Sequence, residues 1–275
     1  MQTLLSLDRN RLAGIASASR DVYEAAVPFP HVVLDDFLPP ATLDGVLAEF
    51  PSPASAGWFR FDSDRERKLA AAGGELLGPI TRHVFAQLNG SAMLDFLGQL
   101  TGIDGLVPDP HLFGGGLHQI ERGGFLEVHA DFNLHPVTRL YRRLNLLLYL
   151  NREWNPVWGG ELELWNRTMS ECEVSIVPLF NRCVILNTTD HSFHGHPQPL
   201  MCPAGVTRKS LALYYYAREP NPSDSTLNAH NTLFQPRPHA GIADATPSVG
   251  RRIAREVLPP IVLRGLRRLR DRRVR

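Results

Sequence analysis

The chain has no sequence feature of a membrane-embedded or exported protein. No apolar run among its 275 residues is long enough to span a bilayer. The amino terminus has neither a basic segment nor a long apolar segment, so we expect no secretory signal. Cysteine is scarce, odd in number and without a Cys-x-x-Cys pair, the three being Cys172, Cys183 and Cys202. We therefore expect free thiols, a reducing compartment and a cytoplasmic location.

The chain also has almost no net charge, with a total of +1. This charge is distributed unevenly along the chain. Residues 251–275 hold ten arginines and two acidic residues, a net charge of +8, which leaves −7 for the remainder. Apolar residues interleave with these arginines in a partly amphipathic pattern. The segment is compatible with contact to an anionic membrane surface, nucleic acid or an acidic partner, with docking on a second subunit, and with a solvated tail.

Internal repeats are also lacking, and the chain divides by composition into three parts. Residues 1–105 contain a predicted strand near 31–38 and a predicted helix over 40–50, with Thr42 as its N-cap. Residues 106–217 are rich in strand patterns, and residues 218–275 form a polar extension that ends in the basic segment. At 43% hydrophobic residues, the chain can bury a large core as one domain with embellishments.

A short polar motif, His129-Ala130-Asp131, carries the first chemical information. In an extended chain, both polar side chains leave the same side of the backbone. His194 follows His129 by 65 residues, and Arg208 lies 14 residues further on, so another strand must fold back beside the first. Two imidazoles and a carboxylate hold Fe(II) on one face and leave three positions open for a co-substrate and oxygen. An arginine supplies a donor fork for a carboxylate arriving at that open face.

The segments around these residues are predicted strands. Residues 144–150 form a short apolar run, and residues 161–165 alternate between apolar and polar after the turn signal Gly159-Gly160. Residues 183–186 and 210–216 are two further short strands. A barrel or jelly roll brings such separated strand ends together around one pocket.

The motifs occur in a specific order: His129-x-Asp131, Leu148-Tyr149-Leu150-Asn151, Trp154, Gly159-Gly160-Glu161-Leu162, His194-Gly195 and Arg208-x-Ser210-Leu211. Over roughly residues 112–217 this order resembles the 2-oxoglutarate/Fe(II)-dependent dioxygenases, in particular their prolyl-4-hydroxylase-like branch. The resemblance implies an α+β fold, with a double-stranded β-helix (jelly-roll, cupin-like) core and N-terminal helices packed on the sheet. It also implies that His129, Asp131 and His194 bind iron, and that Arg208 binds the distal carboxylate of 2-oxoglutarate.

Neighbouring residues compete for two of these roles. His191 and His196 flank His194, but the resemblance favours His194 because an aromatic residue precedes it and His-Gly-x-Pro follows. Lys209 neighbours Arg208, and some members of the branch use lysine for the carboxylate. Strand alternation directs Arg208 inward and predicts that Lys209 faces solvent.

The resemblance adds three predicted co-substrate contacts. Tyr149 matches a position whose phenol contacts the same carboxylate, although a plain core tyrosine is the alternative. Asn145 shares its strand face and is expected in the pocket. Leu162 lies where relatives place an apolar wall, for which ordinary core packing is the alternative. A polar stretch follows the first motif, and two interpretations of it are open: a loop that faces the substrate and a solvated loop. Its residues are Asn133, His135, Arg139, Arg142 and Arg143.

The predicted function is hydroxylation of an unactivated C–H bond in a peptidyl or amino-acid-like small substrate, with release of succinate and CO2. Fe(II), 2-oxoglutarate and O2 are the implied cofactors, and ascorbate is a candidate reductant. Desaturation and cyclisation use the same oxidant. Two alternatives are a non-oxidative, cupin-like metal-binding jelly roll and a binding protein that acts through its basic tail. A zinc hydrolase is disfavoured, because no His-Glu-x-x-His helix is present.

Overall fold

The computed structural model describes residues 5–73, 76–222, 224 and 229–234. Its helices are α1 (Arg9–Ala25), α2 (Pro40–Ala48), α3 (Pro79–Leu88), α4 (Ser91–Thr101) and the short 3-10 helix η2 (Pro156–Trp158). Its strands are β1 (His31–Leu34), β2 (Phe59–Asp62), β3 (Glu66–Ala71), β4 (Val107–Pro108), β5 (Gly116–Ile120), β6 (Phe125–Ala130), β7 (Tyr141–Tyr149), β8 (Leu162–Trp165), β9 (Cys172–Ile176), β10 (Cys183–Asn187), β11 (His194–His196), β12 (Arg208–Ala217) and β13 (Leu233–Phe234). None of the helices in these ranges is long and apolar enough to cross a membrane.

The helix boundaries follow from local capping chemistry. The Asp8 carboxylate accepts hydrogen bonds from the backbone N–H groups of Asn10 and Arg11, which caps α1. Helix α2 begins differently: Pro39 is its N-cap residue and no side chain caps it. Thr42 lies inside the helix, so its predicted capping role is wrong. The fixed φ of proline in the first turn starts this helix instead.

The strands in the described ranges form one curled antiparallel sheet. Its order is β1-β10-β7-β12-β5-β3-β6-β11-β8-β9, with β2 paired to β3, β4 to β12 and β13 to β6. Strands far apart in the sequence are therefore neighbours, as β1 beside β10 and β3 between β5 and β6. Residues 5–105 thus contribute strands to the same sheet as the later residues; the boundaries at 105 and 217 stay predictions.

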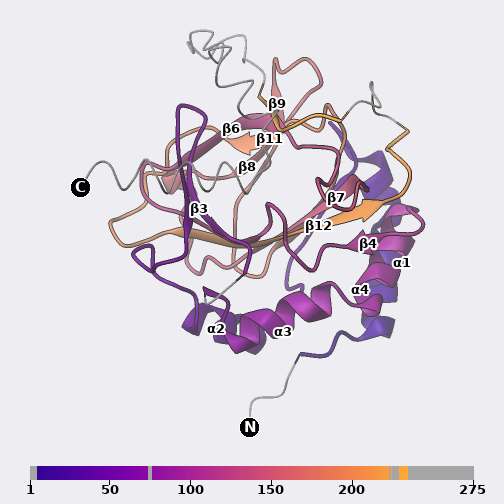
Figure 1. Cartoon of the computed structure of the whole chain (residues 1–275), viewed down its shortest axis with the longest axis horizontal. Coiled ribbons are helices and arrows are strands. Elements are labelled where there is room, and N and C mark those ends of the chain that lie inside the picture. Colours follow the sequence, from indigo (N-terminus) through magenta and orange to yellow (C-terminus); the bar gives the residue numbers. More distant parts are fainter. Residues whose placement is uncertain (1–4, 74–75, 223, 225–228, 235–275) are drawn as a thin grey trace. The chain divides into compact units, whose positions relative to one another are not determined.

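Four α-helices lie along one side of this sheet (Figure 1). Apolar residues of α1, α2, α3 and α4 form a single cluster with the leucines on one face of β7 and β12. Leu144, Leu146 and Leu148 are fully buried in it. The predicted fold class, a double-stranded β-helix with N-terminal helices packed on the sheet, is confirmed. The predicted strands at 144–150, 161–165, 183–186 and 210–216 correspond to β7, β8, β10 and β12.

Candidate functional site

The antiparallel pairing of β6 and β11 brings the two predicted histidine ligands together. His194 lies directly opposite His129 in the register, and their ring centroids are 4.7 Å apart. Asp131 follows β6 by one residue, with its Oδ1 3.6 Å from His129 Nε2 and its Oδ2 3.4 Å from His194 Nε2. In the described part of the chain these three residues form the single group able to hold a metal ion, with ligand atoms within 4.8 Å of one another.

The absence of a side chain at Gly195 allows this close approach of β11 to β6. A Cβ atom there would lie 2.8 Å from the carbonyl oxygen of Leu126 and 3.0 Å from that of Glu127. Any other residue would push the strands apart. The spacing of the two imidazoles therefore depends on a glycine between His194 and His196.

Hydrogen bonds to the backbone fix the tautomers of both imidazoles. His129 Nδ1 lies 2.8 Å from the Glu127 carbonyl oxygen, and His194 Nδ1 lies 2.9 Å from that of Ser192. A carbonyl oxygen only accepts, so each Nδ1 donates its proton and each Nε2 keeps a lone pair directed at the carboxylate. Burial lowers the pKa of His194 to about 4, so this ring is neutral at neutral pH. Both rings are therefore prepared as metal ligands.

The Asp131 carboxylate is oriented by residues of β7. Its Oδ2 accepts hydrogen bonds from Asn145 Nδ2 at 2.6 Å and from Arg142 Nη2 at 2.9 Å. Arg142 Nε donates to Asn145 Oδ1 at 2.7 Å, which closes the triangle. Burial opposes ionisation, but the charge of Arg142, with smaller electrostatic contributions from His129 and His194, holds the pKa of Asp131 well below its usual range. Asp131 is thus an ionised, fixed carboxylate.

Arg142 itself is locked between two aromatic rings. Its guanidinium carbon lies 3.3 Å from the ring centroid of Tyr214 and 4.7 Å from that of Phe132. The residue is only 2% exposed, so a solvated-loop role is wrong for it, as for Asn133 and His135, which are also buried.

A second polar group lies on β12 and β7. Arg208 donates from Nε to the Gly160 carbonyl oxygen at 2.7 Å and from Nη2 to the Tyr149 hydroxyl at 3.2 Å. Gly160 has φ +80°, and a Cβ there would meet the Arg208 side chain at 3.1 Å, so glycine is needed at this contact. Leu162 packs in one buried cluster with Tyr149. Arginine, phenol and apolar wall therefore lie together, as a carboxylate site requires.

The competing residues lie elsewhere. His191 Nδ1 is 2.7 Å from Asp190 Oδ1 in the loop before β11. Lys209 is on the opposite face of β12 from Arg208, where it is half-buried with its ammonium 5.9 Å from the Phe50 ring. Its predicted exposure to solvent is therefore only partly right. His196 is buried, but the group of ligand atoms does not include it.

The short strand β13 brings the polar extension back to this site. Leu233 and Phe234 pair with Ala130 and His129, and the Phe234 ring centroid is 5.4 Å from that of His129. The guanidinium carbon of Arg65 lies over the Phe234 ring, 5.1 Å from its centroid. This contact could not be predicted from the sequence, because two residues are too few for a strand pattern.

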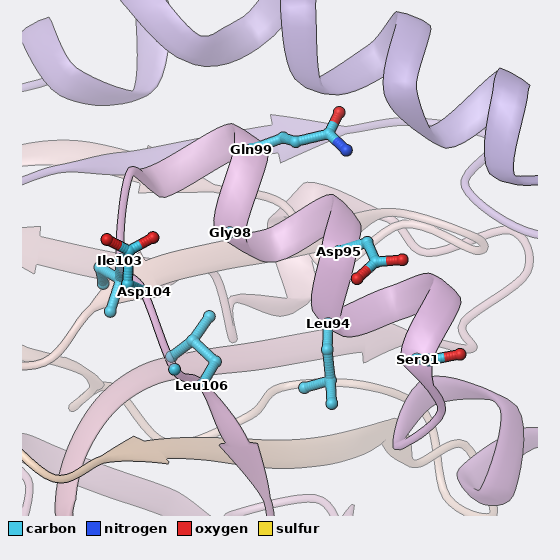
Figure 2. Close-up of a pocket in the computed structure, with 9 residues that line it drawn as sticks. Ser91, Leu94, Asp95, Gly98, Gln99, Ile103, Asp104 and Leu106 are labelled. Atoms are coloured by element: carbon cyan, nitrogen blue, oxygen red, sulfur yellow. The ribbon is translucent and has the colours of Figure 1, made fainter.

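A groove of about 580 Å³ lies away from these residues, along α4 and the segment that follows it. Figure 2 shows Asp95 and Gln99 on α4, with Asp104 and Leu106 on the following segment. Asp95 is paired with Arg9. The groove contains none of the predicted site residues, and we assign it no chemistry.

Comparison with known proteins agrees with the geometry. Residues 115–216 match the family model of the 2OG-Fe(II) oxygenase superfamily. The fold is similar to a prolyl-4-hydroxylase of Pseudomonas putida, with TM-score 0.52 and 17% identity, over 76% of this chain and 100% of that one. It is also similar to a prolyl 4-hydroxylase of Phytophthora capsici, with TM-score 0.54 and 20% identity, over 83% of this chain and 72% of that one.

A third similar structure is a Trichoplax adhaerens prolyl hydroxylase in complex with a peptide fragment of the hypoxia inducible factor oxygen degradation domain. Its TM-score is 0.52 and its identity 17%, over 76% of this chain and 90% of that one. No curated protein sequence matches the chain.

Proposed function

We propose that this protein is a dioxygenase that hydroxylates an unactivated C–H bond of a peptidyl or amino-acid-like small molecule. The match of residues 115–216 to the 2OG-Fe(II) oxygenase superfamily supports this proposal. The family implies Fe(II), 2-oxoglutarate and O2. In the balanced reaction, substrate, O2 and 2-oxoglutarate yield hydroxylated substrate, succinate and CO2. One oxygen atom of O2 enters the hydroxylated substrate and the other enters succinate. The metal and the co-substrate supply the oxidising chemistry when bound, and the protein supplies binding and orientation.

The donor set of the site supports Fe(II). We assign the metal to His129 Nε2, His194 Nε2 and the carboxylate of Asp131, since these are two imidazoles with Nδ1 bonded to the backbone and one ionised carboxylate within 4.8 Å. This is the set that non-haem iron oxygenases use with positions left open. Arg142 and Asn145 are positioning residues for Asp131, because both donate to its Oδ2. The predicted contact of Asn145 with the co-substrate stays a prediction.

The pair of Arg208 and Tyr149 supports 2-oxoglutarate binding. A buried guanidinium and a phenol that already contact each other form a donor pair suited to the distal carboxylate. Burial raises the pKa of Tyr149, so its hydroxyl stays protonated and able to donate. Leu162 supplies the apolar wall beside the carbon chain. Phe234 covers His129 and helps to exclude water from the reacting atoms.

The proposed substrate class is supported by one structural neighbour. The peptide in the Trichoplax adhaerens neighbour favours a peptidyl substrate, and the fold alone is shared with that protein. Ascorbate as a reductant and a cytoplasmic location remain predictions. Contact of the basic segment with an anionic surface or partner also remains a prediction, because residues 251–275 lie outside the described residues.

The test is 2-oxoglutarate turnover by the purified full-length chain. We expect succinate to form without added substrate, at a slow uncoupled rate, only when Fe(II) and O2 are both supplied. A screen of peptides and free amino acids for the gain of one oxygen atom then identifies the substrate. Tight Fe(II) binding without any consumption of 2-oxoglutarate or O2 would instead identify a non-oxidative metal-binding jelly roll.

A further inference from the structure

His196 is a buried side chain whose polar atoms have no partner. The residue is 3% exposed, and neither Nδ1 nor Nε2 makes a hydrogen bond within the described residues. Buried polar atoms are nearly always paired, so an orphaned imidazole indicates a missing ligand. His129 and His194 lack this feature, because each donates its Nδ1 proton to a carbonyl oxygen.

The position of His196 on β11 directs it toward the candidate site. It is two residues beyond His194 on β11, and its partner Leu126 is three residues before His129 on β6. The extra residue of this irregularity is therefore on β6, and alternation along β11 places His194 and His196 on one face. Both Arg208 and His129 act electrostatically on the ring of His196. The imidazole thus lies within the electrostatic reach of both parts of the site, the metal group and the carboxylate group.

The surroundings of His196 specify what kind of ligand is missing. An imidazole carries at least one N–H donor in either protonation state, and Arg208 and Lys68 are the charged groups that act most strongly on this ring. Arg208 and Lys68 are also donors without acceptor capacity. Lys68 is paired with the Glu66 carboxylate at 3.1 Å. The acceptors of Arg208, the Gly160 carbonyl oxygen and the Tyr149 hydroxyl, are both neutral, so an anion suits the Arg208 side best. An anion with several oxygen atoms satisfies these donors together.

We propose that His196 donates a hydrogen bond to the carboxylate of 2-oxoglutarate that Arg208 and Tyr149 bind, so that the co-substrate site of this protein includes an imidazole. The inference rests on the proposed function, because it assigns a residue to the co-substrate of that reaction. It gives a role to a histidine that the metal group leaves unused.

The test uses the full-length protein loaded with Mn(II), which occupies the metal site without turnover, and measures 2-oxoglutarate binding by calorimetry. His196→Leu removes both nitrogen atoms. We expect 2-oxoglutarate to bind about ten- to hundred-fold more weakly, as for a lost hydrogen bond to a charged group, while Mn(II) affinity is unchanged. His196→Asn and His196→Gln each keep an N–H donor, and one of them should recover part of the affinity.

His191→Leu is the matched control, since it removes a histidine three residues before His194 that contacts Asp190 instead. It should leave 2-oxoglutarate affinity unchanged. The unmodified protein provides a second readout that does not depend on folding of a variant. On addition of 2-oxoglutarate, the ring 15N and N–H resonances of His196 should shift, and those of His191 should not.

The outcomes separate two kinds of failure. If the unmodified protein binds Mn(II) but no 2-oxoglutarate, the proposed function itself fails. If it binds 2-oxoglutarate and His196→Leu binds equally well, or the His196 resonances do not move, only the role of His196 is overturned. A loss of Mn(II) affinity in His196→Leu also overturns it, because His196 would then be a metal ligand.

Discussion

Strands β7 and β12 have two faces with opposite chemistry. On β7, Leu144, Leu146 and Leu148 are buried in the apolar cluster that includes the four helices, whereas Asn145 and Tyr149 contact the candidate site residues Asp131 and Arg208. The first face needs only apolar side chains of suitable volume. The second needs particular atoms at hydrogen-bonding distance. One strand therefore combines stability and chemistry, and substitutions on its two faces should affect different measurements.

The largest effect is expected from Asp131→Ala. The two remaining imidazoles cannot hold the three-ligand geometry, so Fe(II) binding and succinate formation should fall by more than the roughly 10- to 100-fold that loss of an outer-shell partner costs. His129→Ala and His194→Ala should behave alike. The exposed carboxylate Asp44, paired with Arg152, offers the control Asp44→Ala, which should retain full activity. Retained activity in His194→Ala, with loss in His196→Ala, would show that the second ligand is misassigned.

The second-largest effect is expected from Arg208→Ala. Removing this charged donor should weaken 2-oxoglutarate binding by about 2–5 kcal/mol, while Fe(II) affinity changes little. Arg208→Lys should recover only part of the loss, because a point charge replaces a planar fork. Lys209→Ala, on the other face of β12, is the comparison variant. An unchanged 2-oxoglutarate dissociation constant in Arg208→Ala would place the carboxylate elsewhere.

On the helix-covered face, Leu146→Ala should lower the free energy of unfolding by about 2–5 kcal/mol through a cavity in the core. Its metal and 2-oxoglutarate affinities should remain those of the unmodified protein at temperatures where it is folded. Leu146→Met, which conserves volume, should cost less than about 1.5 kcal/mol. Denaturant unfolding measures both. A change in ligand affinity as large as that of Arg208→Ala would mean that the two faces are not separable.

The smallest effect is expected from Arg142→Met, which keeps an unbranched side chain between Tyr214 and Phe132 but removes the donor to Asp131. Metal affinity should fall roughly 10- to 100-fold, because Asn145 alone then orients the carboxylate. Arg139→Met, at an exposed position in the preceding loop, should have no effect on metal binding. Equal metal affinity in both variants would reduce Arg142 to a packing residue.

The two faces also differ in how far the sequence predicted them. The leucine face and the strands behind it followed from apolar periodicity alone. The inward direction of Arg208 and Tyr149 followed from alternation. Arg142 could not be predicted in this way, because counting back from Leu144 places it on the helix-covered face. A register shift between Tyr215 and Tyr216 puts Arg142 opposite Tyr216 and reverses its direction.

The pairings between strands that are far apart in the chain could not be predicted from the sequence either. Nothing local in Glu66–Ala71 specifies that β3 lies between β5 and β6, because that position depends on the partners available in the folded sheet. The pairing of β13 with β6 is of the same kind. The motif identified residues by their chemistry, and only the assembled sheet identified their supporting neighbours.

That last pairing has a consequence for how the protein is made. Synthesis proceeds from the amino terminus, so His129, Asp131 and His194 leave the ribosome well before Phe234 does. All three can be brought together by β6 and β11 while the ring of His129 is still uncovered on the side that β13 later occupies. A nascent chain that stops short of Phe234 therefore carries the candidate metal ligands without the aromatic cover of His129.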